Sequence, residues 1–249
     1  MKVLVIGATG TIGKAVVNAL VARHQVVSAG HRQGEFRVDL AELASIENLF
    51  GSVGHVDAVV SAAGAARSGP FADLTDQDFR VGLLNKLLGQ INLTRVAAKV
   101  LPSGGSVTLA AGLASRHFAP GIVPVCVVNA GLEAFVQGAR LEMPRGIRLN
   151  AVSPGWVLET RLAFGMDSSA GTPAAELALA YVRSVEGTET GTVFDVGRFR
   201  SCGSVWTNHH AIRRNRSLRL GQRARSDAVC PIRRHPRVRR HGGACISET

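Results

Sequence analysis

Three glycines near the start of the chain have the spacing of a phosphate-binding turn. They lie directly after the apolar run Val3–Ile6, in the segment Gly7-Ala8-Thr9-Gly10-Thr11-Ile12-Gly13. Unpaired N–H groups and the dipole at a helix N-terminus attract anions. Such glycines allow a tight turn, a close approach of the backbone to phosphates, and close helix–strand packing. The segment therefore predicts a dinucleotide site, with Gly7, Thr9, Gly10, Thr11, Ile12 and Gly13 as contacts.

The residues after the second expected strand indicate which dinucleotide binds. An acidic residue there would bond the ribose 2′-hydroxyl and favour NAD. This chain has Gly30-His31-Arg32 instead, and a guanidinium can pair with a 2′-phosphate. We expect NADP as the cofactor, with NAD as the alternative, and His31 and Arg32 as contacts. The competing interpretation makes Arg32 a solvated loop residue.

Strand-like and helix-like stretches, which must position these residues, alternate as far as Gly197. The strands are expected at Val3–Ile6, Gln25–Ser28, Asp57–Ser61, Ser106–Leu109, Ile147–Val152 and Gly191–Val196. The helices are expected at 11–22, Ser45–Phe50, around Phe79 and Leu83, and at 84–100, Ala130–Glu142 and Ala174–Val185. Thr75 and Asp78 have the spacing of a capping box. This alternation predicts an α/β fold, a single Rossmann-like, doubly wound parallel sheet with helices on both faces.

All of the chain's excess charge lies in residues 198–249. This segment has 13 arginines, no lysine and two acids, so its net charge of +11 equals that of the whole chain. The composition predicts a disordered, solvated tail outside the 1–197 domain, and we interpret its abrupt onset as an extension from a shifted reading frame. Nucleic-acid binding is a third hypothesis that depends wholly on this tail. We expect neither nucleic-acid nor zinc binding, because the tail has two aromatic residues and no Cys-x-x-Cys pair.

Composition also bears on the compartment. No apolar run reaches the roughly 18 residues needed to span a bilayer. The first apolar residues run straight into the glycine turn, as a strand does and a signal peptide does not. Cys126 is the single cysteine of residues 1–197, which gives no disulfide framework and suits a reducing compartment. We therefore expect a cytoplasmic protein with no membrane segment.

With the glycine turn, several later segments resemble the short-chain dehydrogenase/reductase family. Asp39-Leu40 resembles the pair that borders the adenine pocket, and Ser61-Ala62-Ala63-Gly64 resembles the family's Asn-Asn-Ala-Gly. Gly89 and Thr94 match the spacing in the fourth helix, and residues 146–155 resemble the Pro-Gly segment that cups the nicotinamide. The resemblance covers about 1–197 and implies an oxidoreductase. It adds these cofactor contacts: Asp39, Leu40, Ala62, Ala63, Gly64, Lys86, Pro154, Gly155 and Val157.

The residues that the resemblance implies for catalysis are missing. They are a tyrosine acid/base, a lysine four residues later, a serine that polarises the substrate oxygen and an asparagine that supports a proton relay. Their positions hold, in that order, Val125, Asn129, Ala110 with Ala111, and Lys86. The chain's single tyrosine, Tyr181, is followed four residues later by Val185. Because Val and Ala cannot transfer protons, the sequence resembles a short, tyrosine-lacking branch with a non-standard active site.

Two other side chains are candidates for the proton transfer. A desolvated lysine has a lowered pKa and can donate a proton, which makes Lys86 the catalytic candidate; a cofactor contact or a salt bridge is its alternative role. His117 can titrate near neutrality, and an exposed loop residue is its alternative. Tyr181 is expected to pack in the core with a hydrogen-bonded hydroxyl.

Two functions from different classes remain open. The first is an NADP(H)-binding oxidoreductase with a rebuilt proton-transfer group and an unknown small-molecule substrate. The second is a non-catalytic NADP(H)-binding or sensing protein, for which a retained glycine turn and missing catalytic residues are both expected. The resemblance also implies a homodimer or homotetramer formed through helices 84–100 and 130–142. The short segment 156–172 favours an open site, and no metal site is predicted.

Overall fold

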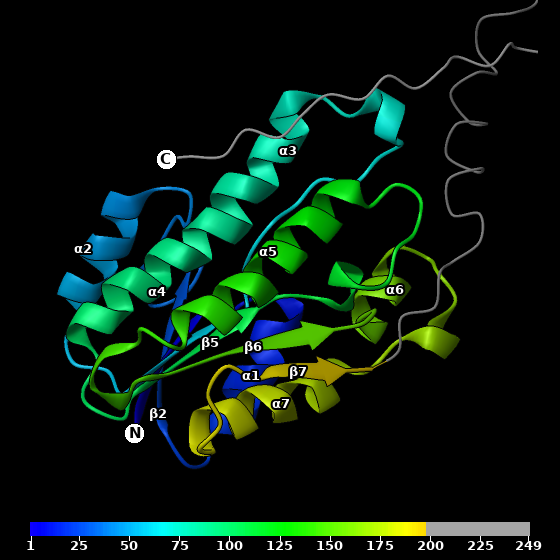
Figure 1. The fold of residues 1–249 in the computed structure, drawn as a ribbon. Helices are drawn as coiled ribbons and strands as arrows, with labels where there is room; N and C mark the ends of the chain where they lie inside the picture. The colour runs from blue at the N-terminus through cyan, green and yellow to red at the C-terminus, as the bar shows by residue number, and fades with distance from the viewer. Residues whose placement is uncertain (198–249) are drawn as a thin grey trace, which may run out of the picture. The chain divides into compact units, whose positions relative to one another are not determined.

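The computed structural model describes residues 1–197, which form one parallel sheet with helices on both faces (Figure 1). The strands are β1 (Lys2–Ile6), β2 (Gln25–Gly30), β3 (Phe36–Arg37), β4 (Ala58–Ser61), β5 (Ser106–Ala110), β6 (Arg148–Pro154) and β7 (Val193–Val196). Their order is β3-β2-β1-β4-β5-β6-β7, with every neighbouring pair parallel. The predicted doubly wound α/β fold is confirmed. The strand order reverses between β1 and β4, and ligands of such sheets bind at the carboxyl ends beside that point.

The helices divide between the two faces of the sheet. They are α1 (Thr11–Leu20), α2 (Leu43–Val53), α3 (Asp76–Gly82), α4 (Gly89–Val100), α5 (Val123–Ala139), α6 (Leu158–Ala163) and α7 (Ala174–Glu186). Figure 1 shows α2, α4 and α5 on one face and α1 with α7 on the other. The short helix α6 lies beyond the arrowheads of β6 and β7, at the carboxyl edge.

The core has two layers because the strands are covered on both sides. Along β1, Leu4 and Ile6 belong to the layer under α2, α4 and α5, whereas Val3 and Val5 belong to the layer under α1 and α7. Successive side chains of a strand point to opposite faces, so a strand between two helical layers must be apolar throughout. The uninterrupted run Val3–Ile6 follows from this requirement.

The segment between α3 and α4 departs from the predicted pair of helices. Thr75 caps α3 as predicted, since its side chain accepts from Asp78 N and the Asp78 carboxylate accepts from Thr75 N. The chain then continues without a break through the π-helical turns Leu83–Leu88 into α4. π-Helical turns are rare and occur frequently at functional sites. This one carries Asn85 and Lys86.

Three other elements differ from the sequence-based expectation. Helix α5 begins at Val123, seven residues before the predicted start, with Pro124 in its first turn, where proline is tolerated. The two-residue strand β3 and the six-residue helix α6 were not predicted, because both are too short to show a period. None of the helices within residues 1–197 is long and apolar enough to cross a membrane. The predicted disordered tail lies outside the described residues.

Candidate functional site

The glycine turn has the geometry of an anion-binding site. Gly7 has a φ of +78°, and a Cβ at this position would lie 2.8 Å from the carbonyl oxygen of Ala62. A Cβ on Gly13 would collide with the carbonyl oxygen of Gly7, so both positions require glycine. Helix α1 starts at Thr11 with no side-chain cap, and a Cβ on Gly10 would meet only the Gly7 oxygen, at 3.3 Å. The first turn of α1 therefore offers its N–H groups to an external anion.

A cavity of about 360 Å³ opens beside this turn, at the carboxyl ends of β1, β2 and β4. Six residues predicted as cofactor contacts line it: Gly7, His31, Arg32, Leu40, Ala63 and Gly64. Five other lining residues were not predicted as contacts: Ile6, Gly30, Val38, Ala65 and Asn85. Asn85 comes from the π-helical turns, and its side-chain oxygen accepts a hydrogen bond from Ala65 N at 2.8 Å. No sequence spacing signals this contact, because it depends on the π-helical geometry.

Polar groups gather at the open end of the cavity. His31 and Arg32 are exposed, and His31 Nδ1 lies 3.9 Å from a carboxylate oxygen of Asp39. The other Asp39 oxygen accepts from Ala41 N at 2.9 Å, which holds the carboxylate in the loop after β3. Arg32 has no hydrogen bond or ion pair to any residue in 1–197. Its guanidinium is thus available to a phosphate at the mouth of the cavity.

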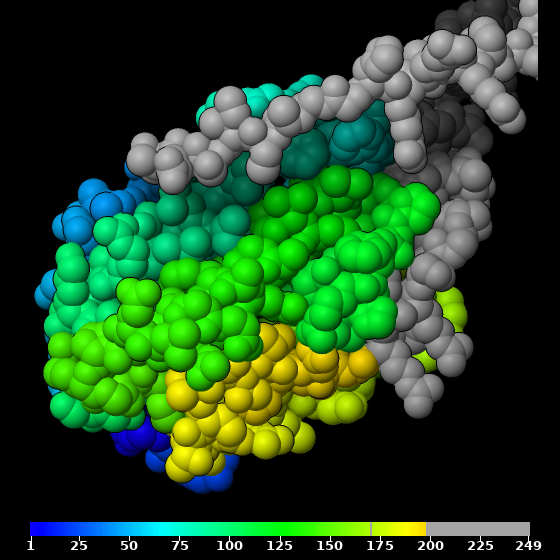
Figure 2. Space-filling view, in the orientation of Figure 1, coloured from blue at the N-terminus to red at the C-terminus, as the bar shows by residue number. Residues whose placement is uncertain are grey.

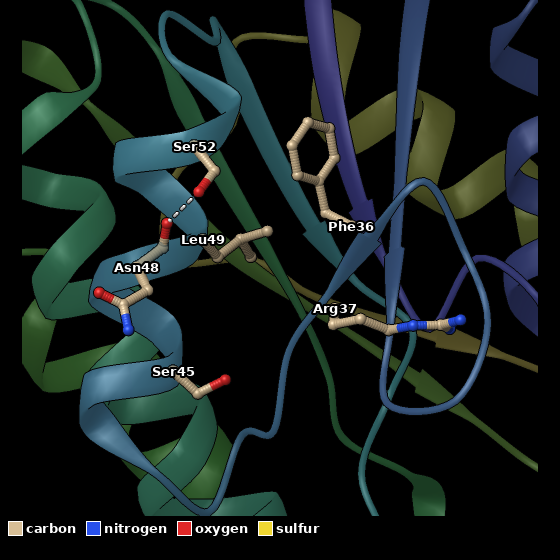
Figure 3. A pocket seen from close by; sticks show the side chains of 6 residues that line it. All are labelled: Phe36, Arg37, Ser45, Asn48, Leu49 and Ser52. Atoms are coloured by element: carbon tan, nitrogen blue, oxygen red, sulfur yellow. Dashed lines mark hydrogen bonds between the residues drawn. The ribbon is translucent and has the colours of Figure 1, made fainter.

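A second hollow, of about 470 Å³, lies between β3 and α2 at the sheet edge (Figure 3). Phe36 and Arg37 of β3 face Ser45, Leu49 and neighbouring residues of α2, but Figure 3 shows the Arg37 guanidinium extending away from the helix. The hollow contains no residue of the glycine turn. We therefore do not place the dinucleotide here, although its volume exceeds that of the first cavity.

Lys86 lies next to the first cavity and is partly buried. Its Nζ donates to the carbonyl oxygen of Ala111, directly after β5, at 3.1 Å. Its aliphatic stem packs so closely on Gly64 that a Cβ there would lie 2.7 Å from Lys86 Cγ. Burial lowers the pKa of the Lys86 ammonium from 10.5 to about 8. The group is therefore mostly protonated at neutral pH, but it releases its proton far more readily than an exposed lysine.

Apart from Lys86, the positions aligned with the missing catalytic residues hold no acid or base. Val125 is half-buried on α5, and Ala111 is buried at the end of β5. Asn129 is 2% exposed, and its side-chain oxygen has no hydrogen-bond partner in the part of the chain that the structure describes. Its amide nitrogen packs against Gly112, where a Cβ would lie 2.7 Å away.

The two other titratable candidates lie elsewhere. His117 is exposed in the segment after β5. Tyr181 is fully buried in the layer under α1 and α7, which confirms its predicted core role. The expected hydrogen bond of its hydroxyl is not found, because that oxygen has no partner among the described residues 1–197. Burial without a partner raises the pKa of Tyr181 far above its ordinary value, so it takes no part in proton transfer.

The remaining predicted contacts lie at the same edge of the sheet but do not line the cavity. Ala62 follows β4, where its N–H donates to Ile6 O at 2.8 Å. Pro154 ends β6, Gly155 N donates to Val196 O at 2.9 Å, and Val157 forms an isolated bridge with Thr172. Since β6 is the neighbour of β5, these residues extend the edge beyond Lys86 and Ala111.

A charged network at the far end of this edge was not predicted. The Glu133 carboxylate on α5 accepts from Ser115 Oγ at 2.7 Å and from Ser153 Oγ. Arg116 lies 3.2 Å from the same carboxylate and also binds Asp195 on β7 at 2.6 Å. Asp195 and Glu133 together raise the pKa of Arg116. The network joins the turn after β5 to α5, β6 and β7; its members are far apart in sequence, so no spacing reveals it.

Comparison with known proteins gives consistent results. A family model described as enoyl-(acyl carrier protein) reductase matches residues 6–194. The L-xylulose reductase of Bos taurus is 27% identical over 175 residues, which cover 63% of this chain and 72% of the relative. Carbonyl reductase [NADPH] 2 of Sus scrofa is 28% identical over 178 residues, covering 64% and 72%.

Solved structures agree in fold over the described part of the chain. The protein lin1944 from Listeria innocua is 37% identical with a TM-score of 0.76, covering 79% of this chain and 99% of that one. A small-chain dehydrogenase in complex with NADPH is 26% identical with a TM-score of 0.70, covering 79% and 96%.

Proposed function

Because the chain belongs to the short-chain dehydrogenase/reductase family, a family of oxidoreductases, we propose that it reduces a carbonyl compound with NADPH, using Lys86 as the proton donor. The observation that carries the proposal is the partly buried Lys86, beside the cavity formed by the glycine turn. In this proposal Lys86, which stands at the position of the family's asparagine, takes over the proton transfer of the missing tyrosine.

The residues of the cavity fit an NADP molecule. The uncapped first turn of α1 suits the pyrophosphate, and the apolar walls Val38 and Leu40 suit the adenine ring. Arg32, exposed at the cavity mouth, suits the 2′-phosphate. The carbonyl reductase of Sus scrofa, whose name includes NADPH, and the small-chain dehydrogenase solved in complex with NADPH support this choice over NAD.

Lys86 has the properties that proton donation requires. Bound NADPH supplies a hydride, and a carbonyl oxygen that gains negative charge then needs a positive group and a proton. The Lys86 ammonium offers both at Nζ, and its pKa of about 8 lies close to the working pH. The Ala111 carbonyl holds Nζ at the end of β5, and solvent returns the proton to the neutral amine.

A matched pair of variants tests the role of Lys86. Turnover of NADPH would be followed with a panel of aldehydes and ketones, for the wild-type protein, Lys86→Ala and the exposed-lysine control Lys99→Ala on α4. We expect Lys86→Ala to lose at least about a hundredfold in kcat and to retain NADPH binding by calorimetry, with the control unchanged. The wild-type kcat should fall above about pH 8, because Lys86 then loses its proton. Unchanged kcat in Lys86→Ala would refute the role.

The absence of an acid or base at the positions of the family's tyrosine, lysine and serine supports a second candidate, a non-catalytic NADP(H)-binding or sensing protein. Val125, Ala111 and Asn129 leave a cavity able to hold a dinucleotide without the family's usual chemistry. NADPH binding with no turnover of any carbonyl in the panel would favour this candidate over the first. Absence of binding would exclude both.

Exposed apolar side chains support the association of copies through α4 and α5. Leu84, Leu88 and Val127 are each more than two-fifths exposed, on the π-helical turns and on α5. In Figure 2, α4 and α5 form a broad continuous part of the visible face. We propose a homodimer or homotetramer formed through this face, which sedimentation of the wild-type protein and a Leu84→Lys, Leu88→Lys variant would test.

A further inference from the structure

Arg161 on α6 is a buried cation that lacks most of its expected partners. Its side chain is 2% exposed, and its Nη1 has no hydrogen-bond partner among residues 1–197. Its Nε donates to the carbonyl oxygen of Asp167, and its guanidinium lies 5.7 Å from the centre of the Trp156 ring. A buried guanidinium normally binds carboxylates or several carbonyl oxygens, because an unpaired buried charge is costly.

Another arginine of the same domain shows what a satisfied guanidinium looks like. Arg148 is also partly buried, but its Nη1 and Nη2 donate to the carbonyl oxygens of Ser184 and Val185 at 2.6 and 2.8 Å. Arg161 has no ion pair with a carboxylate among residues 1–197. Its positive charge contributes to a lowered pKa at Asp167, yet the Asp167 oxygens accept from Ser169 and not from the guanidinium. Within residues 1–197, Arg161 thus lacks an anionic partner.

The position of Arg161 indicates which ligand supplies the missing anionic group. The adenosine part of the cavity lies at β2, and Lys86 reaches Ala111 at the end of β5, so a dinucleotide would run along the edge in that direction. Arg161 follows β6, the next strand beyond β5, and α6 lies past its carboxyl end (Figure 1). A group bound at Arg161 therefore lies beyond the end of the dinucleotide that carries the hydride.

We propose that Arg161 binds the carboxylate of the substrate, which makes the substrate class the oxo acids. The inference rests on the proposed function for the bound NADPH and the carbonyl group. A planar guanidinium matches a carboxylate in a bidentate geometry, and the Trp156 ring and the Asp167 carbonyl fix its orientation. Arg161 is a specificity-determining residue, separate from Lys86, which acts on the carbonyl oxygen.

The cofactor's pyrophosphate is the competing anion. Glu159 of α6 lines a shallow pocket together with Thr11 and Lys14 of α1, which brings α6 near the glycine turn. However, the Glu159 carboxylate accepts from Ala174 N, at the start of α7, so this end of α6 is already engaged with the protein. The test must therefore separate substrate binding from cofactor binding.

Calorimetry on the full chain saturated with NADP⁺, the oxidised cofactor that cannot reduce a carbonyl, makes that separation without turnover. Pyruvate, acetoacetate and levulinate, which space the carbonyl and carboxylate differently, would each be titrated beside its neutral amide. The variants are Arg161→Met, which keeps the aliphatic packing, and the control Arg183→Met. Arg183 also lies over a ring, that of Phe194 at 5.3 Å, but it is exposed and paired with Glu189.

At least one oxo acid should bind the wild-type complex about tenfold or more tightly than its amide. The difference should vanish in Arg161→Met and persist in Arg183→Met. Arg161→Met should also unfold at the same temperature as the wild type or higher, because it removes an unpaired buried charge. Equal affinity for every acid and its amide, a preference that survives in Arg161→Met, or a loss confined to NADP⁺ affinity would each overturn the proposal. Failure of the Lys86 mechanism would change turnover alone and leave these binding results standing.

Discussion

Lys86 illustrates how a group suited to chemistry reduces the stability of the fold that holds it. Its ammonium is partly buried, and the Ala111 carbonyl is its one hydrogen-bond partner in residues 1–197. Burial removes water from the ammonium. This desolvation lowers the pKa of Lys86, which favours proton donation, and it also makes the charged group unfavourable in the folded state. Replacing such a functional residue with one of similar shape commonly makes the protein more stable.

A Lys86→Met variant should therefore be more stable than the wild type at pH 7, by about 1–3 kcal/mol after allowance for the partial exposure of the side chain. Below about pH 8 the lysine is charged in both folded and unfolded states, and the cost is present in full. Between about pH 8 and 10.5 the folded amine loses its proton first, so the stability difference between variant and wild type shrinks. Urea unfolding of both proteins at pH 7 and pH 9.5 measures this difference. A difference of the same size at both pH values would contradict the prediction.

Arg32 should decide between the two nicotinamide dinucleotides. Removing its guanidinium in Arg32→Ala should weaken NADPH binding by about tenfold or more, because a charge-assisted pair with the 2′-phosphate is lost. NADH has no such phosphate, so its affinity should not change. The matched control is Arg37→Ala, whose guanidinium is exposed on β3 outside the cavity (Figure 3). Calorimetry with both cofactors distinguishes this result from an equal weakening of both, which would mean that Arg32 is only a solvated loop residue.

At the scale of elements, the Glu133 network links the parts of the edge beyond Lys86. Glu133 accepts from two serines and from Arg116, so its removal leaves the two serine hydroxyls without this acceptor and Arg116 with Asp195 as its remaining carboxylate partner. Glu133→Ala should lower the unfolding free energy by about 1–3 kcal/mol in urea titrations. Glu142→Ala, an exposed glutamate just beyond α5, is the control and should change it little. A loss no larger than that of the control would show that the network carries little stability.

The elements also show where prediction from sequence succeeds. The run Val3–Ile6 and the turn from Gly7 to Gly13 were predicted correctly because each reflects a local requirement, burial on both faces or a backbone that excludes Cβ. The start of α5 was missed because its first residues are rich in valine, which favours strands locally, and packing on the sheet overrides that preference.

The residues of the candidate site also divide into those that local sequence predicts and those that it does not. Gly7 and Arg32 could be identified from their neighbours in the sequence. Gly7 lies in the turn between the first strand and the first helix, and Arg32 follows the second strand. Asn85 and Glu133 could not be identified, because the π-helical turns and contacts between distant segments bring them into place. The unpaired Nη1 of Arg161 is a property of the folded surroundings and has no counterpart in the sequence.

At the scale of the whole molecule, the chain divides into a balanced domain and a strongly basic segment. All seven strands of the sheet lie within residues 1–197, and the last of them, β7, ends at Val196. Residues 1–197 have equal numbers of basic and acidic side chains, so the net charge of +11 belongs to residues 198–249. The proposed cofactor site and the excess charge thus belong to different parts of the chain, and cofactor binding should be separable from the charge.

A protein ending at Gly197 should therefore keep its fold and its NADPH affinity, within about twofold by calorimetry, and should unfold at a temperature close to that of the full chain. Any binding of DNA or RNA at physiological salt should be confined to the full chain, because arginine–phosphate contacts supply non-specific affinity and the domain has no excess charge. Gel-shift titrations at two salt concentrations, run beside the thermal scans, test both halves of the prediction. Loss of solubility or of thermal stability on truncation would contradict it, because the sheet would then need residues 198–249 to complete its packing.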